Sequence, residues 1–168
     1  MIYQYRGITP ETEKAAFVAE SADIAGEVYL GEDASVWYNV SIRGDLQPVY
    51  IGKGSNIQDG SVVHVAHEQP TRIGDNVTVG HNAIIHACTI GNTCLIGMGA
   101  IILDGAEIGE ESIVGAGSLV TQNKKFPPRS LIIGSPAKAI RTLSEEQVES
   151  LHHHGKGYVE LAREYAGG

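Results

Sequence analysis

Residues 73–108 read IGDNVTVGHNAIIHACTIGNTCLIGMGAIILDGAEI. An aliphatic residue recurs at roughly every sixth position of this stretch, often directly before a glycine. The pattern continues outward in both directions, so that seventeen positions of the chain hold only Ile, Val or Leu. These positions are Val18, Ile24, Leu30, Val36, Ile42, Ile51, Ile57, Val63, Ile73, Val79, Ile85, Ile90, Ile96, Ile102, Ile108, Val114 and Val120. A hexapeptide repeat is typical of a parallel β-helix, and the sequence therefore predicts an all-β solenoid.

The repeat also predicts which residues lie above one another. Each hexapeptide forms a short strand and a turn, and three of them make one rung of a triangular prism with the aliphatic side chains inside. Successive rungs are separated by one strand spacing, roughly 4.8 Å. We expect the inward residues of the rungs at 18/24/30, 36/42/51, 57/63/73, 79/85/90, 96/102/108 and 114/120, the last rung being completed by a residue near 132.

Three segments are expected along the chain. Residues 1–16 form an N-terminal lead-in, residues 17–140 the hexapeptide-repeat β-helix domain, and residues 141–168 a C-terminal α-helix. Ser144 and Gln147 have capping-box spacing at the start of this helix, which we expect to pack along the outside of the coil. Gly155 and Gly157 are expected to divide the helix into two pieces.

Charge and composition narrow the class of partner. Twelve Lys and Arg residues against 20 Asp and Glu residues give a net charge of -8 at pH 7, which argues against a nucleic acid or an anionic membrane as partner. The sequence contains no signal-peptide pattern and no run of about eighteen apolar residues. We therefore expect a soluble, cytoplasmic protein in which Cys88 and Cys94 are free, partly buried thiols.

The six-residue period is broken at three places. The step from Ile42 is nine residues, the step from Val63 is ten, and the step from Ile85 is five. All three breaks follow the middle inward residue of their rungs, so they fall at one corner of the prism in three consecutive rungs. Irregularities in an indifferent scaffold have no reason to cluster, and this corner is the candidate site.

The register places chemically active side chains beside that corner. Arg43, His64 and His86 directly follow the middle inward residues, so they form one outward-facing column, in which two imidazoles one rung apart can share a metal ion. Asp59 and His81 each lie two places after a first-column residue and stack on a different face. On one chain His81 therefore points away from the histidine pair, and a three-fold assembly is needed to bring it to the pair of a neighbour.

Three neutral imidazoles and an open water position are the ligand set of catalytic zinc, and imidazole also suits iron, cobalt or nickel. Neutral ligands leave the full charge of the metal to act on the water, whose pKa falls to roughly 7.

Alternative interpretations remain for single residues. Arg43 and Asp59 can form an interface ion pair, which does not exclude a catalytic role. His67 can be a further ligand or a proton shuttle, but a mobile loop residue is favoured. For residues 152–154 a solvated or packing role is favoured over a metal tract.

Several motifs together resemble the gamma-class carbonic anhydrase-like proteins, a family whose bacterial members are often labelled ferripyochelin-binding or carnitine- and phenylacetate-operon proteins. The resemblance covers nearly the whole chain. The motifs are Arg43-Gly44-Asp45, Asn56-Ile57-Gln58-Asp59, Val63-His64, Thr78-Val79-Gly80-His81, Ile85-His86-Ala87-Cys88-Thr89-Ile90-Gly91, Gly97-Met98-Gly99 and Gly115-Ala116-Gly117-Ser118-Leu119-Val120.

The resemblance implies a left-handed parallel β-helix, an exception to the right-handed crossover rule, in a homotrimer with a metal site at each subunit interface. It implies His64, His81 and His86 as zinc ligands, for which the general preference of imidazole also allows iron or cobalt. Gln58 is similar to the residue that orients a metal-bound hydroxide, which attacks CO2 to give bicarbonate.

The resemblance also assigns residues around the ligands. Arg43 and Asp59 resemble a pair that borders the substrate pocket, and Asp45 resembles an intersubunit ion-pair residue. Tyr158 is similar to a tyrosine that reaches the site from the C-terminal segment. Leu46 replaces an acidic residue of the archaeal prototype.

The acidic proton-relay loop of the prototype is short in this chain, where it offers only His67 and Glu68. Regenerating the nucleophile requires a proton to leave the site, so a missing relay can limit turnover. The alternatives to CO2 hydration are metal-dependent hydrolysis of a thioester at the same site and a trimeric scaffold or binding protein with a vestigial metal site. A hexapeptide acyltransferase shares the coil, but its long protruding loop has no counterpart in the short insertions of this chain.

Overall fold

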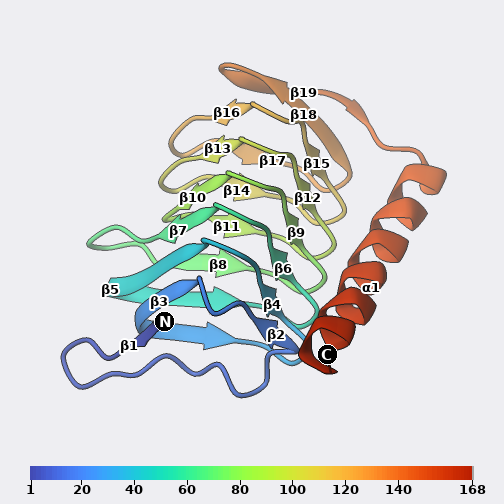
Figure 1. Ribbon diagram of the computed structural model, residues 1–168. Helices are drawn as coiled ribbons and strands as arrows, with labels where there is room; N and C mark the ends of the chain where they lie inside the picture. Colours follow the sequence, from blue (N-terminus) through green and yellow to red (C-terminus); the bar gives the residue numbers. More distant parts are fainter. Residues whose placement is uncertain (168) are drawn as a thin grey trace.

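The computed structural model describes residues 1–167 and confirms the predicted left-handed parallel β-helix with one C-terminal helix. The chain winds through about seven turns, and helix α1 lies along one side of the coil (Figure 1). Most strands are only two or three residues long, because each hexapeptide must also supply a turn. Within residues 1–167 no helix is both long and apolar enough to cross a bilayer.

The first face of the prism is an eight-stranded sheet, which α1 partly covers. Its strands are β2 (Phe17–Val18), β4 (Ser35–Val36), β6 (Asn56–Ile57), β9 (Thr78–Val79), β12 (Leu95–Ile96), β15 (Ile113–Val114), β18 (Ser130–Gly134) and β19 (Ala137–Thr142). All pair in parallel except β19, which folds back antiparallel on β18.

The second and third faces form one eleven-stranded sheet, because two long strands turn the corner between them without a break. These two strands are β3 (Asp23–Leu30) and β5 (Ser41–Ile51). The second face also contains β1 (Ile2–Tyr3), β7 (Val62–His64), β10 (Ile84–His86), β13 (Ile101–Ile102) and β16 (Leu119–Val120). The third face is completed by β8 (Thr71–Ile73), β11 (Thr89–Ile90), β14 (Glu107–Ile108) and β17 (Lys125–Phe126).

The inward columns follow the predicted register, apart from the last rung. Val63 pairs with Ile42 and Ile85, and the aliphatic residues of all three faces form one continuous core. The expectation that a residue near 132 completes the 114/120 rung is wrong: Phe126 occupies that place, and Ile132 begins a further turn above Val114. Phe126 packs against the core at this position, where a pattern of Ile, Val and Leu gives no signal.

The three period breaks have different structures. The nine-residue step lies within β5, whose pairing with β3 contains a bulge beyond Gly44. A side chain at Gly44 would place its Cβ 2.2 Å from the Glu27 carbonyl oxygen, so the corner requires glycine. The ten-residue step forms the loop between β7 and β8, and the five-residue step is a tight turn in which Ala87 adopts a φ of 47°.

Helix α1 runs unbroken from Glu145 to Gly167, so the expected division of the helix at Gly155 and Gly157 is wrong. Gly155 is buried against Asn76, and the absence of a Cβ lets the helix approach the coil closely there. The capping box is confirmed, since the side chains of Ser144 and Gln147 each bond the other's backbone N–H. Tertiary packing and the cap thus outweigh the low helix propensity of glycine.

Cys88 and Cys94 are free and buried, and burial raises the pKa of each thiol to about 12. We expect the native protein at pH 8 to react with Ellman's reagent more than about 100-fold more slowly than the unfolded chain, because the thiolate is the reactive species. The unfolded chain ionises near pH 9.0 while the folded chain stays protonated, so the free energy of unfolding should fall as the pH rises from about 9. Rapid labelling of both thiols in the native state would contradict this placement.

Candidate metal centre

His64 and His86 form a pair on the second face. His86 at the end of β10 pairs in register with His64 at the end of β7, as the repeat predicts. Nδ1 of His64 lies 3.1 Å from Nε2 of His86, and the ring centroids are 5.1 Å apart. The side chains are 16% and 32% exposed, so both rings remain within reach of a ligand from outside.

A carboxylate lies at the far side of each imidazole. Asp45 Oδ1 is 3.0 Å from His64 Nε2, and Asp104 Oδ1 is 2.6 Å from His86 Nδ1. Burial alone would raise the pKa of Asp45, but the hydrogen bonds from His64 and Arg43 and the charge of Arg43 outweigh it and lower the pKa. The pKa of His64 is lowered, chiefly by burial, so its neutral form is favoured.

The hydrogen bonds of the pair fit a cation between the two rings. When each neutral imidazole donates its N–H to its carboxylate, the lone pairs of His64 Nδ1 and His86 Nε2 face each other. The separation of 3.1 Å is close to the spacing of about 3.3 Å expected between two nitrogens on a tetrahedral zinc ion with Zn–N bonds of about 2.0–2.1 Å. The donor set and its spacing therefore suit zinc or another metal that prefers imidazole.

His81 lies at the opposite edge of the second face. It occupies the turn after β9, where its Nδ1 is 3.0 Å from Asp59 Oδ2. Among residues 1–167, no group of three or more His, Cys, Asp and Glu side chains is placed to hold a metal ion. A single chain thus presents an incomplete ligand set, with His64 and His86 along one edge of the face and His81 along the other.

An apolar stripe separates the two edges. Its members project outward from neighbouring strands of the second face and pair with one another in register. They are Val62, Ile84, Ile101 and Leu119. Val62 and Ile84 are 39% and 38% exposed, which is high for aliphatic side chains on adjacent strands. On one rung the stripe residue Ile84 lies between His81 and His86 in the sequence. The stripe therefore lies between the edge that carries His81 and the edge that carries the histidine pair.

Gln58, His81 and Tyr158 line one pocket. Gln58 is only 4% exposed, and its Nε2 donates to Asn56 Oδ1 at 3.1 Å, which fixes the orientation of the amide. Tyr158 comes from α1 and packs edge-on against the buried Trp37, with centroids 5.9 Å apart. Burial raises the pKa of Tyr158, and the charge of Asp59 adds to the shift, while a hydrogen bond with Gln58 opposes it.

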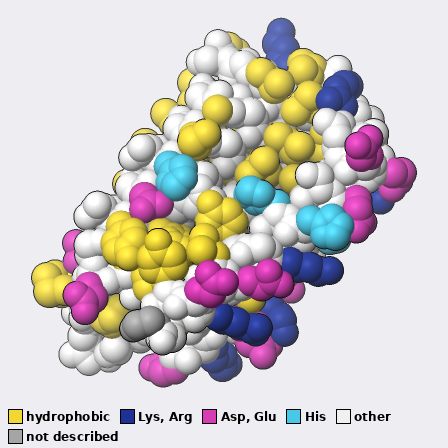
Figure 2. Space-filling view, turned by 45° about the vertical axis from the view of Figure 1, so that its right-hand side comes forward, with side chains coloured by type: hydrophobic (Ala, Val, Ile, Leu, Met, Phe, Trp, Pro, Cys, Tyr) yellow, Lys and Arg dark blue, Asp and Glu magenta, His cyan; other side chains and the backbone are white. Residues whose placement is uncertain are grey.

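These residues border a pocket of about 420 Å³ between α1 and the first face. Gln58, His81 and Tyr158 supply its polar edge. Its other walls are mostly apolar and include Leu95, Ile96, Met98, Ile113, Val114 and Ala116. Figure 2 shows this side of the molecule, where apolar side chains gather beside histidines. The pocket has the composition of a small-molecule site, apolar with a few polar groups at one end.

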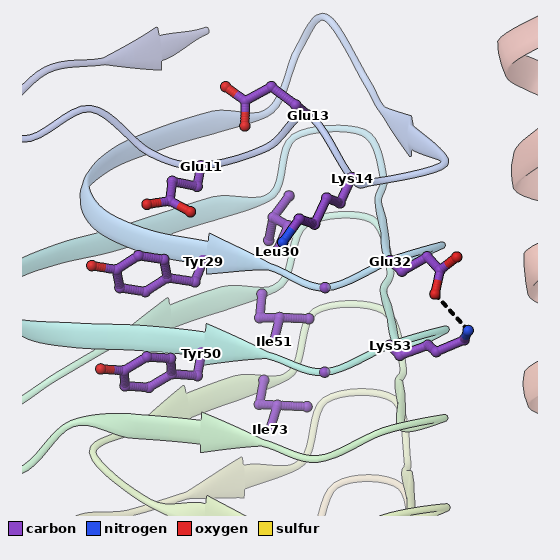
Figure 3. Close-up of a pocket in the computed structure, with 12 residues that line it drawn as sticks. Glu11, Glu13, Lys14, Tyr29, Leu30, Glu32, Tyr50, Ile51, Lys53 and Ile73 are labelled. Carbon is purple, nitrogen blue, oxygen red and sulfur yellow. Dashed lines mark hydrogen bonds and ion pairs between the residues drawn. The ribbon is translucent and has the colours of Figure 1, made fainter.

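A larger hollow of about 790 Å³ lies elsewhere, at the edge of the third face. Figure 3 shows Tyr29 and Tyr50 stacked along it and the Glu32–Lys53 ion pair of 2.6 Å at its other end. Its walls contain no histidine, cysteine or serine. Volume alone therefore does not identify the functional site, because the histidine pair and His81 lie outside this hollow.

The remaining predicted site residues divide between the two edges. Arg43 forms its ion pair with Asp45, on the side of the histidine pair, whereas Asp59 pairs with His81, so the chain does not bring Arg43 and Asp59 together. His67 lies exposed in the loop after β7, where its carbonyl accepts a hydrogen bond from Gln47.

Asp104 was missed in the sequence analysis, and His154 was expected only in a solvated or packing role. Asp104 belongs to the turn after β13, one rung beyond His86, and the step from Ile102 to Ile108 that contains it has the regular length of six residues, so no break in the period marked it. His154 lines the 420 Å³ pocket beside Tyr158, with ring centroids 5.3 Å apart. Its position depends on how α1 docks, which the repeat does not encode.

Comparison with known families identifies the repeat. The profile described as bacterial transferase hexapeptide (six repeats) matches residues 87–122, and the profile described as hexapeptide repeat of succinyl-transferase matches residues 70–99. A solved structure of a Bacillus cereus protein named as an acetyltransferase superposes with a TM-score of 0.96 at 45% identity, covering 99% of this chain and 97% of the other.

Two curated relatives carry a different name. The carbonic anhydrase of Geobacillus kaustophilus is 47% identical over 165 residues, covering 98% of this chain and 91% of the relative. Gamma carbonic anhydrase 2, mitochondrial, of Arabidopsis thaliana is 43% identical over 164 residues, covering 94% of this chain. The chain spans 59% of the length of that plant relative.

Proposed function

Because the chain belongs to the family of gamma-class carbonic anhydrase-like hexapeptide proteins, we propose that it is a metalloenzyme that hydrates CO2 to bicarbonate. The proposed ligands are His64 and His86 of one subunit and His81 of the next subunit in a homotrimer. Zinc is the proposed metal, with iron or cobalt as alternatives. A divalent metal held by three neutral imidazoles supplies a water-derived nucleophile at neutral pH.

The observation that carries the proposal is the split ligand set. His81 and the His64/His86 pair occupy opposite edges of one face, with the exposed apolar stripe between them. A ring of three chains uses two different surfaces at every interface and leaves no surface unpaired. Burying the stripe against neighbours in such a ring brings the His81 edge of one chain to the histidine pair of another. The same interface would thus bury the apolar stripe and complete the set of three histidine ligands.

The surrounding residues have distinct proposed roles. The fixed amide of Gln58 orients the attacking oxygen, and Tyr158 closes the site from the side of α1. Arg43 supplies positive charge beside His64, where the bicarbonate product carries its negative charge. Asp59 holds the imidazole of His81 at Nδ1. Across the interface, Asp59 is also the proposed partner of Arg43. Asp45 accepts from both Arg43 and His64, which joins the interface ion pair to the ligand.

A specific observation supports a second candidate, hydrolysis of a thioester or another acyl substrate by the same nucleophile. The pocket of about 420 Å³ beside Gln58 and His81 is much larger than a three-atom substrate requires, and apolar side chains line most of it. An acyl chain is a suitable occupant of such a pocket. The acetyltransferase name of the Bacillus cereus relative makes acetyl-coenzyme A a necessary member of the substrate panel.

The test uses untagged protein purified with its metal. We expect about one metal ion per chain, since each of three interfaces in a trimer holds one site, and CO2 hydration that chelation abolishes and zinc restores. Rapid-mixing assays of CO2 hydration, with thioesters and acetyl-coenzyme A in parallel, separate the candidate reactions. A trimer that binds neither zinc, iron nor cobalt, or that binds them without turnover of any substrate, would instead be a scaffold or binding protein with a vestigial site.

A further inference from the structure

The Asp104 carboxylate is held rigidly against the outer nitrogen of His86. Its Oδ1 lies 2.6 Å from His86 Nδ1. Two backbone hydrogen bonds fix the turn that carries it: Gly105 N–H donates to the Ala87 carbonyl, and Asn123 N–H donates to the Asp104 carbonyl. Gly105 has a φ of 69°, and a Cβ there would lie 2.2 Å from Asn123 Oδ1, so the turn favours glycine. The position of the carboxylate is therefore set by the coil and not by a mobile loop.

The charge of Asp104 is committed to this one contact. Among residues 1–167, Asp104 forms no ion pair with Lys or Arg, whereas Asp45 behind His64 shares its charge with Arg43. An unshared carboxylate is the stronger acceptor, and it selects the His86 tautomer that carries its proton on Nδ1. That tautomer leaves the lone pair of Nε2 directed toward His64.

We propose that Asp104 is a positioning residue for the metal: it fixes the tautomer and ring orientation of His86, so that Nε2 faces the metal position. The inference rests on the proposed function, because it assumes that His86 binds a metal through Nε2. Carboxylates behind ligating histidines act in this way, and their loss weakens metal binding by roughly 10- to 100-fold. Asp104 carries this role without contact with the substrate.

The experiment compares zinc affinities of the full-length assembled protein, measured by competition with a chelator. We expect Asp104→Ala to weaken zinc binding by about 10- to 100-fold and Asp104→Asn, which keeps an oxygen acceptor without the charge, to weaken it less. Glu107→Ala is the matched control, because Glu107 lies three residues away and pairs with Lys125 on the third face. This control should bind zinc as the unmodified protein does.

A second readout separates positioning from a general loss of structure. In the cobalt-loaded protein, Asp104→Ala should change the visible absorption of the metal, and Glu107→Ala should not. Equal zinc affinity and an unchanged cobalt spectrum in Asp104→Ala would overturn the inference. If Asp104→Ala fails to assemble, Asp104→Asn decides the question by the same two measurements. Failure of the unmodified protein to bind any metal would refute the proposed function itself, and the role of Asp104 with it.

Discussion

His81→Ala is expected to keep the trimer intact but to lower metal affinity by more than about 100-fold, since loss of a direct ligand should exceed the roughly 10- to 100-fold effect of losing an outer carboxylate. CO2 hydration should fall with metal content. The same loss is expected for the double variant His64→Ala/His86→Ala, which retains His81. Measurements are metal per chain after gel filtration and the hydration rate. His153→Ala is the control, because His153 is an exposed histidine of α1 paired with Glu149.

Mixing the two inactive variants gives the decisive result. In trimers reassembled from equal amounts, an interface regains all three ligands when the chain with the intact pair precedes the chain with His81, which by the product of two halves occurs at about one quarter of the interfaces. We therefore expect metal binding and activity to recover to about one quarter of the unmodified level. Recovery cannot occur if one chain supplies all three ligands. A mixture that stays metal-free although it exchanges subunits would refute the shared site.

The histidine pair could be predicted from the sequence because the hexapeptide period converts sequence position directly into position in space. Once Val63 and Ile85 are recognised as inward residues, the residue after each must point outward on adjacent rungs. The same logic separates His81 from the pair by placing it on a different face, and the structure locates it in the turn after β9, at the opposite edge of the second face. Handedness and the roles of Gln58 and Tyr158 came from the family resemblance, because periodicity is the same for either hand.

The parts that escaped prediction depend on contacts between segments. Asp104 lies one rung beyond His86, with which it forms a hydrogen bond. On that rung Leu103 holds the position that directly follows the middle inward residue, so the column of polar residues stops there and the period does not mark Asp104. The pocket beside Tyr158 exists only because α1 docks as one continuous helix, which the glycines argued against. Phe126 was missed because the aliphatic pattern excludes aromatic residues. In α1, packing against the coil outweighs the low helix propensity of the glycines.

Ile84→Lys is expected to dissociate the trimer although it leaves every proposed ligand in place. Ile84 is the stripe residue on the same rung as His81 and His86. Burying an uncompensated charge at this position costs about 3 kcal/mol or more, and each 1.4 kcal/mol changes a dissociation constant about tenfold. The dissociation constant should therefore rise by more than about 100-fold per interface. Sedimentation velocity measures the assembly, and metal analysis of the same fractions measures the site.

Ile140→Lys is the matched control for this substitution, because Ile140 is a more exposed isoleucine that is not a member of the stripe and belongs to β19 of the eight-stranded sheet. It should remain trimeric with a full complement of metal. The Ile84→Lys monomer should be folded but metal-free, and excess zinc should shift it partly back to the trimer, since a ligand that binds only the assembled form stabilises that form by mass action. A metal-loaded monomer would show that the stripe and the site are independent. Assembly and metal binding that rise together with zinc would show that the interface is the site.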